Sequence, residues 1–236
     1  MLEKLKEEVC NANRELVRLG LVTLTWGNVS GLARSKGLVV IKPSGVGYDS
    51  LRPANMVVLD LEGKVVEGKL RPSSDSPTHI RIYKAFGEVG GITHTHSVYA
   101  TMFAQAHREI PCLGTTHADH FAGPVPVTRL LNEREVQADY EGNTGAIIIE
   151  RFARLDPLAV PGVLVAGHAS FAFGIDAAES VRNALTLERV AQMAMGTLQL
   201  NPSLRPLPDY IAQKHYQRKH GPDAYYGQNA QGRRKR

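Results

Sequence analysis

The sequence of 236 residues is poor in cysteine and contains no long apolar run. Its two cysteines, Cys10 and Cys112, are too few for a disulfide framework and lack the close spacing of paired metal ligands. No segment approaches about 18 consecutive apolar residues, which excludes a membrane-spanning helix. The first residues are charged and follow a helical pattern without the apolar core of a signal peptide, so we expect a cytoplasmic protein.

Two phosphate-binding signatures are also missing. The chain has no Gly-x-x-x-x-Gly-Lys-Ser/Thr segment, which excludes a P-loop nucleotidase, and no Gly-x-Gly-x-x-Gly dinucleotide fingerprint. The excess of positive charge lies mostly at the C-terminal end of the sequence. The formal net charge is +5, and Arg233, Arg234, Lys235 and Arg236 contribute four of the positive charges. We therefore expect a basic, disordered tail at 229–236 and no nucleic-acid partner.

What is present is ordinary for a globular protein, with 43% hydrophobic and 22% charged residues. The element pattern predicts a single α/β domain built on a mixed sheet with interleaved helices. Periodicity and capping residues predict helices at 2–19, 77–86, 98–106, 132–140, 176–195 and in a last segment after 208. Apolar, β-branched runs predict strands at 38–41, 56–59, 64–66, 90–94, 146–149 and 163–165.

A His-x-His pair, His94 and His96, lies on one of these strands. Residues two apart on a strand face the same side, so both imidazoles can meet one divalent metal such as zinc. The pair alone is equally compatible with two nearby histidines that bind no metal. His168, at the end of strand 163–165, is one of several candidate third ligands, and Asp75 can serve as an oxygen ligand or as a helix N-cap.

Three short segments rich in glycine and small polar residues, 25–28, 42–45 and 72–75, flank strand or helix ends. Exposed backbone N–H groups in such turns can hold an anion, and Lys42 adds a positive charge. Each segment is equally compatible with an ordinary turn. Residue spacing alone assigns no function to two further polar clusters, at 115–120 and 214–220.

In this order, these clusters resemble the L-ribulose-5-phosphate 4-epimerases, a family in the class II (zinc) aldolase/epimerase superfamily. The resemblance covers residues 1–228, and its segments are LVTLTWGNVS at 21–30, IKPSGV at 41–46, PSSD at 72–75, GGITHTHS at 90–97, GTTHAD at 114–119 and AYYGQ at 224–228. One departure is AGHAS at 166–170, where the family usually has two histidines before Gly-Pro-Phe and this chain keeps only His168.

The resemblance implies a central, mostly antiparallel sheet flanked by helices, and a zinc site. It assigns zinc binding to His94, His96 and His168, with Asp75 reaching the same metal. It assigns substrate and phosphate binding to Gly27, Asn28, Lys42, Ser44, Gly45, Ser73 and Ser74. Asp119 and Tyr226 would be the acid/base pair. The family forms homotetramers, so Tyr226 and His215 would serve a neighbouring subunit's site.

The implied reaction converts L-ribulose 5-phosphate to D-xylulose 5-phosphate by retro-aldol cleavage and re-addition. Two acid/base groups suit it, because a proton is needed on either face of the aldehyde. One alternative is a class II sugar-phosphate aldolase of the fuculose-phosphate type, which releases its fragments. A non-catalytic zinc or RNA-binding module is a second, although structural zinc sites favour four ligands and cysteine.

Overall fold

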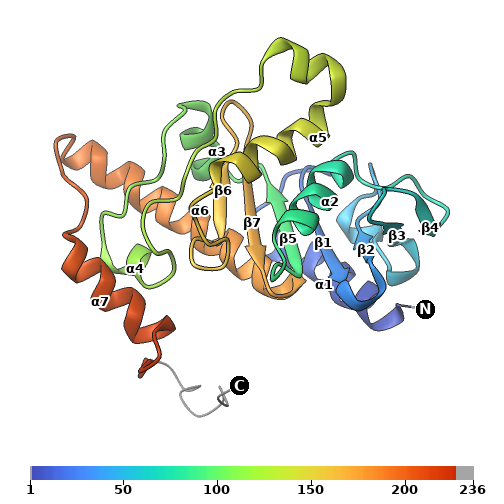
Figure 1. The fold of residues 1–236 in the computed structure, drawn as a ribbon, viewed down its shortest axis with the longest axis horizontal. Helices are drawn as coiled ribbons and strands as arrows, with labels where there is room; N and C mark the ends of the chain where they lie inside the picture. Colours follow the sequence, from blue (N-terminus) through green and yellow to red (C-terminus); the bar gives the residue numbers. More distant parts are fainter. Residues whose placement is uncertain (1, 227–236) are drawn as a thin grey trace.

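A computed structural model describes residues 2–226, and the predicted tail at 229–236 lies outside them. The chain forms one seven-stranded sheet with helices on both faces (Figure 1). Its strand order is β4-β3-β2-β1-β5-β7-β6. The strands are β1 (Asn28–Ala33), β2 (Leu38–Ile41), β3 (Val57–Asp60), β4 (Val65–Glu67), β5 (Gly91–Thr95), β6 (Gly162–Leu164) and β7 (Ser170–Gly174).

All neighbouring strands in this order pair antiparallel. The mostly antiparallel sheet implied by the resemblance is confirmed, whereas the mixed sheet predicted from the element pattern is wrong. Short connections explain the difference, because β1–β2, β2–β3, β3–β4 and β6–β7 are sequential neighbours joined without a crossover helix.

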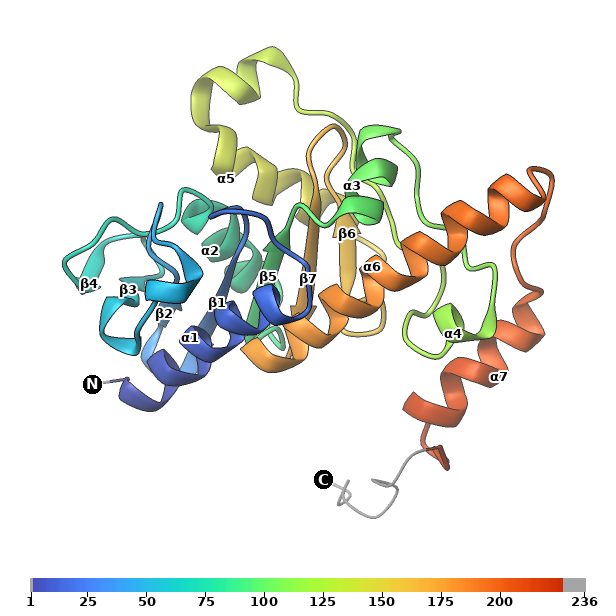
Figure 2. The same cartoon turned by 180° about the vertical axis from the view of Figure 1, so that it is seen from behind.

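Helices α1 and α6 cover one face of the sheet, and α2 and α5 cover the other (Figures 1 and 2). No helix within residues 2–226 is long and apolar enough to cross a lipid bilayer. The helices are α1 (Glu3–Arg18), α2 (Ser76–Ala85), α3 (Val98–Gln105), α4 (Thr115–Ala118), α5 (Glu133–Arg151), α6 (Ala177–Leu200) and α7 (Asp209–His220).

The apolar run of β2 is continuous because both faces of the sheet are buried. Val39 and Ile41 belong to one hydrophobic cluster, and Val40 between them belongs to the other. The same alternation recurs in β7, where Phe171 and Phe173 share the cluster of Val39. Period-two alternation thus assigns successive side chains to two different cores.

The predicted strand at 146–149 is wrong, because these residues continue α5. Ile147 and Ile148 are buried, and packing of this helix against α2 outweighs the β-propensity of the isoleucines. The helix is interrupted at Asp139, which has φ −168° and ψ 86°. Its Oδ1 accepts a hydrogen bond from the Gly142 backbone N–H at 3.0 Å, so Asp139 caps the second half of α5.

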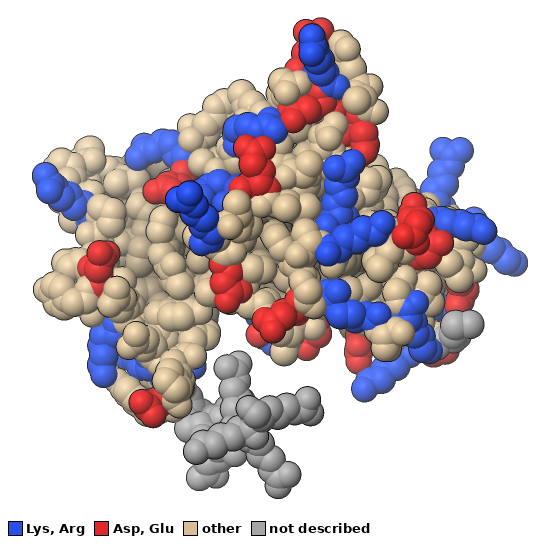
Figure 3. Space-filling model, viewed as in Figure 1, with Lys and Arg blue, Asp and Glu red and all other residues tan. Residues whose placement is uncertain are grey.

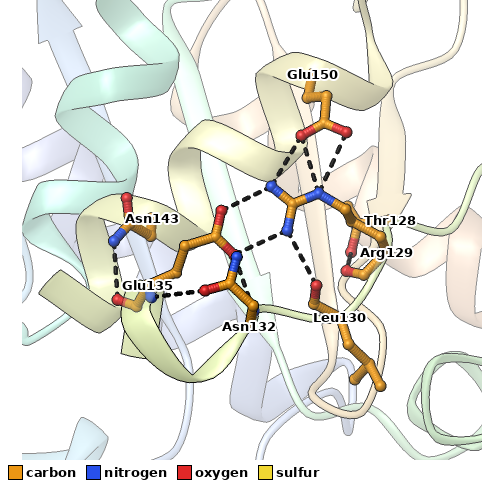
Figure 4. Close-up of polar contacts among 7 residues, drawn as sticks. All are labelled: Thr128, Arg129, Leu130, Asn132, Glu135, Asn143 and Glu150. Carbon is orange, nitrogen blue, oxygen red and sulfur yellow. Dashed lines mark hydrogen bonds and ion pairs between the residues drawn. The ribbon is translucent and has the colours of Figure 1, made fainter. Parts of the chain in front are cut away.

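The start of α5 is held by a charged network (Figure 4). Asn132 and Glu135 form a capping box, in which each side chain accepts a hydrogen bond from the other's backbone N–H, at 3.0 and 2.9 Å. The Arg129 guanidinium donates to the Glu135 carboxylate at 2.7 Å and to the Glu150 carboxylate at 3.0 Å. These two contacts connect the first and last turns of the helix. These contacts stabilise the arm of α5 that projects from the sheet (Figure 1).

Long helix α6 packs very closely on β5 and β7. Gly91 lies against the start of this helix, and a Cβ added there would be 2.1 Å from the backbone oxygen of Asp176. Buried hydrogen bonds then join the helix to the two strands: Ser180 contacts Thr93 at 2.7 Å, and Asn183 Nδ2 donates to the Phe173 carbonyl at 2.7 Å. The position of β5 is therefore determined by backbone contact with α6.

Replacing Gly91 by alanine tests this close approach. Because the added methyl group meets backbone, Gly91→Ala should lower the free energy of unfolding by about 3 kcal/mol. Gly87→Ala is the matched control: a Cβ there meets no atom within 4 Å, and its effect should stay within about 0.5 kcal/mol. Urea denaturation followed by circular dichroism measures both, and equal stabilities for the two variants would contradict the packing argument.

Candidate functional site

Three histidines converge at the end of strand β5. His94 lies on β5, His96 follows it, and His168 lies in the connection between β6 and β7. One ring nitrogen of each lies within 4.8 Å of the others. The rings are arranged as a triangle, with centroids 4.9 to 5.0 Å apart. The predicted third ligand is therefore brought to the predicted pair.

The surroundings of these imidazoles suit metal ligands. His94 Nδ1 donates to the Ser170 carbonyl at 2.9 Å, and the Phe171 ring stacks on the imidazole at 4.2 Å. This hydrogen bond uses Nδ1 of His94, so Nε2 is the nitrogen available to a metal ion. Burial lowers the pKa values of His96 and His168 to about 4, so both rings are neutral at pH 7.

His168 Nδ1 is buried and has no hydrogen-bond partner in the described chain. Unpaired buried nitrogens are rare, because they lose hydration without compensation. A triad of imidazoles with an unpaired buried nitrogen fits a divalent transition metal. The three histidines can hold such an ion with a position left open for a ligand.

Asp75 occupies the N-cap position of α2, but its side chain caps no backbone N–H of that helix. Its Oδ2 instead accepts a hydrogen bond from Asn28 Nδ2 at 2.6 Å. Burial favours the neutral acid, but the electrostatic influence of His94 and His79, with the Asn28 hydrogen bond, lowers the pKa of Asp75 below its usual value. Asp75 is thus a carboxylate beside the triad, and the N-cap interpretation of its side chain is wrong.

A cavity of about 650 Å³ opens beside the triad. It joins the three predicted anion-binding turns to the histidines. Its lining contains Thr25, Trp26, Gly27, Asn28, Lys42, Pro43, Ser44, Gly45, Ser73, Ser74, Asp75, His94, His96, Tyr140, Glu141 and His168. All predicted metal ligands and all predicted substrate-binding residues except His215 therefore lie around one space.

The backbone holds these turns in place. Gly27 has φ +79°, and a Cβ there would lie 2.6 Å from the His94 carbonyl oxygen, so the turn against β5 requires glycine. Ser73 N–H donates to the Lys42 carbonyl at 3.0 Å, which joins the second turn to the third. Lys42 itself is almost fully buried, and burial lowers its pKa. A buried ammonium beside backbone turns is suited to bind an anionic group.

Two residues of the lining, Tyr140 and Glu141, were not predicted as site residues. They follow the interruption of α5 at Asp139, which turns the second half of the helix toward the cavity. The Tyr140 ring lies 6.2 Å from that of His168. The available signal was an Asp three residues before Gly142 inside a helical pattern, the spacing of an internal N-cap.

Asp119, His215 and Tyr226 do not line this cavity. They gather where α4 meets α7, at the end of the molecule away from β2 to β4 (Figure 2). Asp119 Oδ2 accepts from Arg218 Nη2 at 2.7 Å, and Oδ1 accepts from His215 Nδ1 at 3.1 Å. The Tyr226 ring lies 4.4 Å from the Arg218 guanidinium.

This second cluster has its own electrostatics. Burial would raise the pKa of Asp119, but the hydrogen bonds from Arg218 and His215 outweigh it and lower the pKa. Asp119 is therefore ionised at neutral pH. Across the face shown in Figure 3, Lys and Arg are interspersed with Asp and Glu.

Comparison with known proteins agrees with the geometry. Residues 7–195 match the family described as Class II Aldolase and Adducin N-terminal domain. The L-ribulose-5-phosphate 4-epimerase UlaF of Salmonella paratyphi B is 54% identical over 227 residues, which cover 96% of this chain and 100% of that protein.

Two solved structures share the fold. An L-fuculose 1-phosphate aldolase superposes with a TM-score of 0.77 at 24% identity, covering 91% of this chain and 95% of its own. The L-fuculose 1-phosphate aldolase of Glaciozyma antarctica has a TM-score of 0.74 at 18% identity, covering 91% and 81%. The chain therefore belongs to the class II aldolase and adducin N-terminal domain family and, within it, to the L-ribulose-5-phosphate 4-epimerases.

Proposed function

We propose that this chain is a zinc-dependent enzyme that interconverts L-ribulose 5-phosphate and D-xylulose 5-phosphate. One observation carries the proposal: a single cavity of about 650 Å³ joins three converging imidazoles to a buried lysine and three turns that contain glycine or serine. The cavity thus offers a metal site for the ketose and an anion site for the phosphate. The identity to a named epimerase supports the same substrate.

Simple deprotonation cannot invert carbon 4 of a ketose phosphate, because its hydrogen is not on a carbon next to the ketone, and cleavage of the C3–C4 bond avoids this difficulty. A base first removes the proton of the C4 hydroxyl, and the C3–C4 bond then breaks. The bonding electrons pass to the three-carbon fragment as an enediolate, and glycolaldehyde phosphate is the other fragment. The aldehyde turns over, the bond re-forms on its other face, and the new hydroxyl is protonated.

Zinc held by His94, His96 and His168 would supply Lewis-acid stabilisation of the negative charge on the three-carbon fragment. The chain's own residues do the rest. Lys42, Ser44 and Ser73 hold the phosphate, so the aldehyde stays bound while it turns over. Asp75, fixed by Asn28, orients the hydroxyl groups beside the triad.

Asp119 and Tyr226 provide protons on the two faces of the aldehyde in this proposal. Because their cluster lies away from the cavity of its own chain, we place them in the site of a neighbouring subunit of a homotetramer. The ionised Asp119 suits the proton-accepting step, and His215 orients it. A phosphorylated sugar does not cross a lipid bilayer unaided, which supports a cytoplasmic location for this activity.

Removing the metal tests the proposal directly. Purified protein should form D-xylulose 5-phosphate from L-ribulose 5-phosphate, and chelation should abolish turnover because the charge stabilisation is lost. The sheet and its two cores do not depend on the triad, so circular dichroism should stay native. Restored turnover on adding zinc is the control. Loss of the fold on chelation would show a structural metal, and an active chelated protein would exclude a metal-dependent reaction.

Shared sites predict rescue between inactive variants. Mixed tetramers of Tyr226→Phe and His96→Ala should regain activity in roughly a quarter of their sites. In those sites an intact His96 from one variant subunit meets an intact Tyr226 from the other. Tyr226→Phe mixed with Asp119→Asn is the matched control. Both residues then come from the same subunit, so that mixture should stay inactive. Co-expression with two affinity tags isolates the mixed tetramers, and no rescue there would place each site within one subunit.

The two-face argument predicts opposite stereochemical defects. Asp119→Asn keeps the shape of the side chain but removes its charge, and it should slow epimerisation by about 10²-fold. In aldol addition of dihydroxyacetone to glycolaldehyde phosphate, it should favour one C4 epimer, and Tyr226→Phe should favour the other. Chromatography of the products measures the ratio. Asp49→Asn, an exposed carboxylate outside the cavity, is the control, and equal mixtures from both site variants would contradict the assignment.

A further inference from the structure

The ammonium group of Lys42 is in an unusual position. Lys42 follows β2, and its side chain is among the largest fully buried ones in the described chain. Its Nζ donates to the Pro43 carbonyl at 3.3 Å, and no carboxylate within residues 2–226 pairs with it. A buried charge without a counter-ion is unfavourable unless another group stabilises it.

The aromatic ring of Tyr48 is that group. Tyr48 begins a short 3-10 helix (Tyr48–Ser50) six residues after the lysine, and the intervening loop folds back so that the ring centroid lies 4.8 Å from Lys42 Nζ. The negative face of an aromatic ring attracts a cation, most strongly where water is excluded. Tyr48 is only 4% exposed, so this contact is largely shielded from solvent.

The hydroxyl group of the same residue fixes the ring on the opposite side. It donates to the carbonyl oxygens of Trp26 and Gly27, at 2.7 and 2.9 Å. These two residues form the turn that contacts the His94 carbonyl. Tyr48 does not itself line the cavity, yet it contacts two parts of the lining, the Lys42 cation and the turn that contains Gly27.

We propose that Tyr48 is a positioning residue of the anion site, whose ring keeps the Lys42 ammonium charged and directed toward the bound phosphate. The inference rests on the proposed function, because it takes Lys42 as a phosphate ligand. Simple core packing is the competing explanation. Tyr83 is the comparison that distinguishes the two explanations. It is also buried, at 1% exposed, and its hydroxyl group is hydrogen-bonded to Ser30 Oγ at 2.7 Å. None of the described cation–ring contacts involves it.

Binding of inorganic phosphate to the zinc-loaded protein measures the effect without depending on the sugar. Tyr48→Leu should weaken phosphate binding by about 3- to 30-fold, the range expected for a lost cation–ring contact. Tyr48→Phe keeps the ring and should remain within about twofold of the unsubstituted protein. The zinc dissociation constant should not change in either variant. Calorimetry measures both affinities, and Tyr83→Leu should leave phosphate binding unchanged.

A double-mutant cycle shows whether Tyr48 acts through Lys42. Lys42→Met should weaken phosphate binding, and adding Tyr48→Leu should then produce no further loss. If Lys42→Met weakens binding but Tyr48→Leu does not, the inference is wrong and the phosphate site stands. If Lys42→Met has no effect, the phosphate site of the proposed function is wrong, and the inference fails with it.

If the Tyr48→Leu variant does not fold, a variant with an altered charge distribution on the ring provides the same test. Pentafluorophenylalanine at position 48 has nearly the shape of phenylalanine but no negative ring face. Phosphate binding should be weaker for the fluorinated residue than for Tyr48→Phe by about the same 3- to 30-fold. Equal affinities for the two would overturn the inference, because packing alone would then account for the role of Tyr48.

Discussion

The antiparallel pairing of β5 with β1 and β7 is the constraint on which the rest of the site depends. His94 is paired with Asn28 across one side and with Phe171 across the other. Because side chains alternate along a strand, a slip of one residue would turn His94 to the other face and separate it from Asp75 and His168. The backbone contact of Gly91 with α6 prevents such a slip from the opposite end of β5.

Most buried polar groups around this strand are satisfied within the chain. Thr93 contacts Ser180, Thr95 contacts Ser170, and His94 donates to the Ser170 carbonyl. Two exceptions that line the cavity are His168 Nδ1 and Asn28 Oδ1, and the Lys42 ammonium has an acceptor, the Pro43 carbonyl, but no carboxylate partner in residues 2–226. Their unfavourable desolvation occurs during folding, so a metal ion or an anionic group bound as proposed would meet groups that are already dehydrated.

Short sequence motifs correctly predicted those helices whose ends are stabilised by residues close in the sequence. Asn132 caps α5 at the start of the helix predicted at 132–140, and Asp176 caps α6 at the start of the helix predicted at 176–195. Strand β1 was not predicted, because its polar residues Asn28 and Ser30 are buried through contacts with distant segments. The isoleucines of 146–149 were misassigned for the same reason, since their helical state depends on packing against α2.

The candidate site shows the same division. The histidines and turns were found because their side-chain chemistry is visible in short motifs, and the resemblance placed them together. Tyr140 and Glu141 depend on a break in α5 at Asp139, which no composition reveals. The separation of Asp119 from the cavity depends on how α4 and α7 pack at the far end of α6, which is a property of the folded chain alone.

That separation has an evolutionary consequence. The region matched by the family ends at residue 195, before α7 begins at Asp209. The sheet, the histidine triad and the turns around the cavity form a platform within the matched region, whereas α7 lies outside it. Under the proposed shared-site arrangement, a change in that helix would alter which groups reach an adjoining cavity without displacing the three histidines. New reactions can therefore arise on this platform by exchanging the C-terminal segment, with the ancestral chemistry of the cavity preserved.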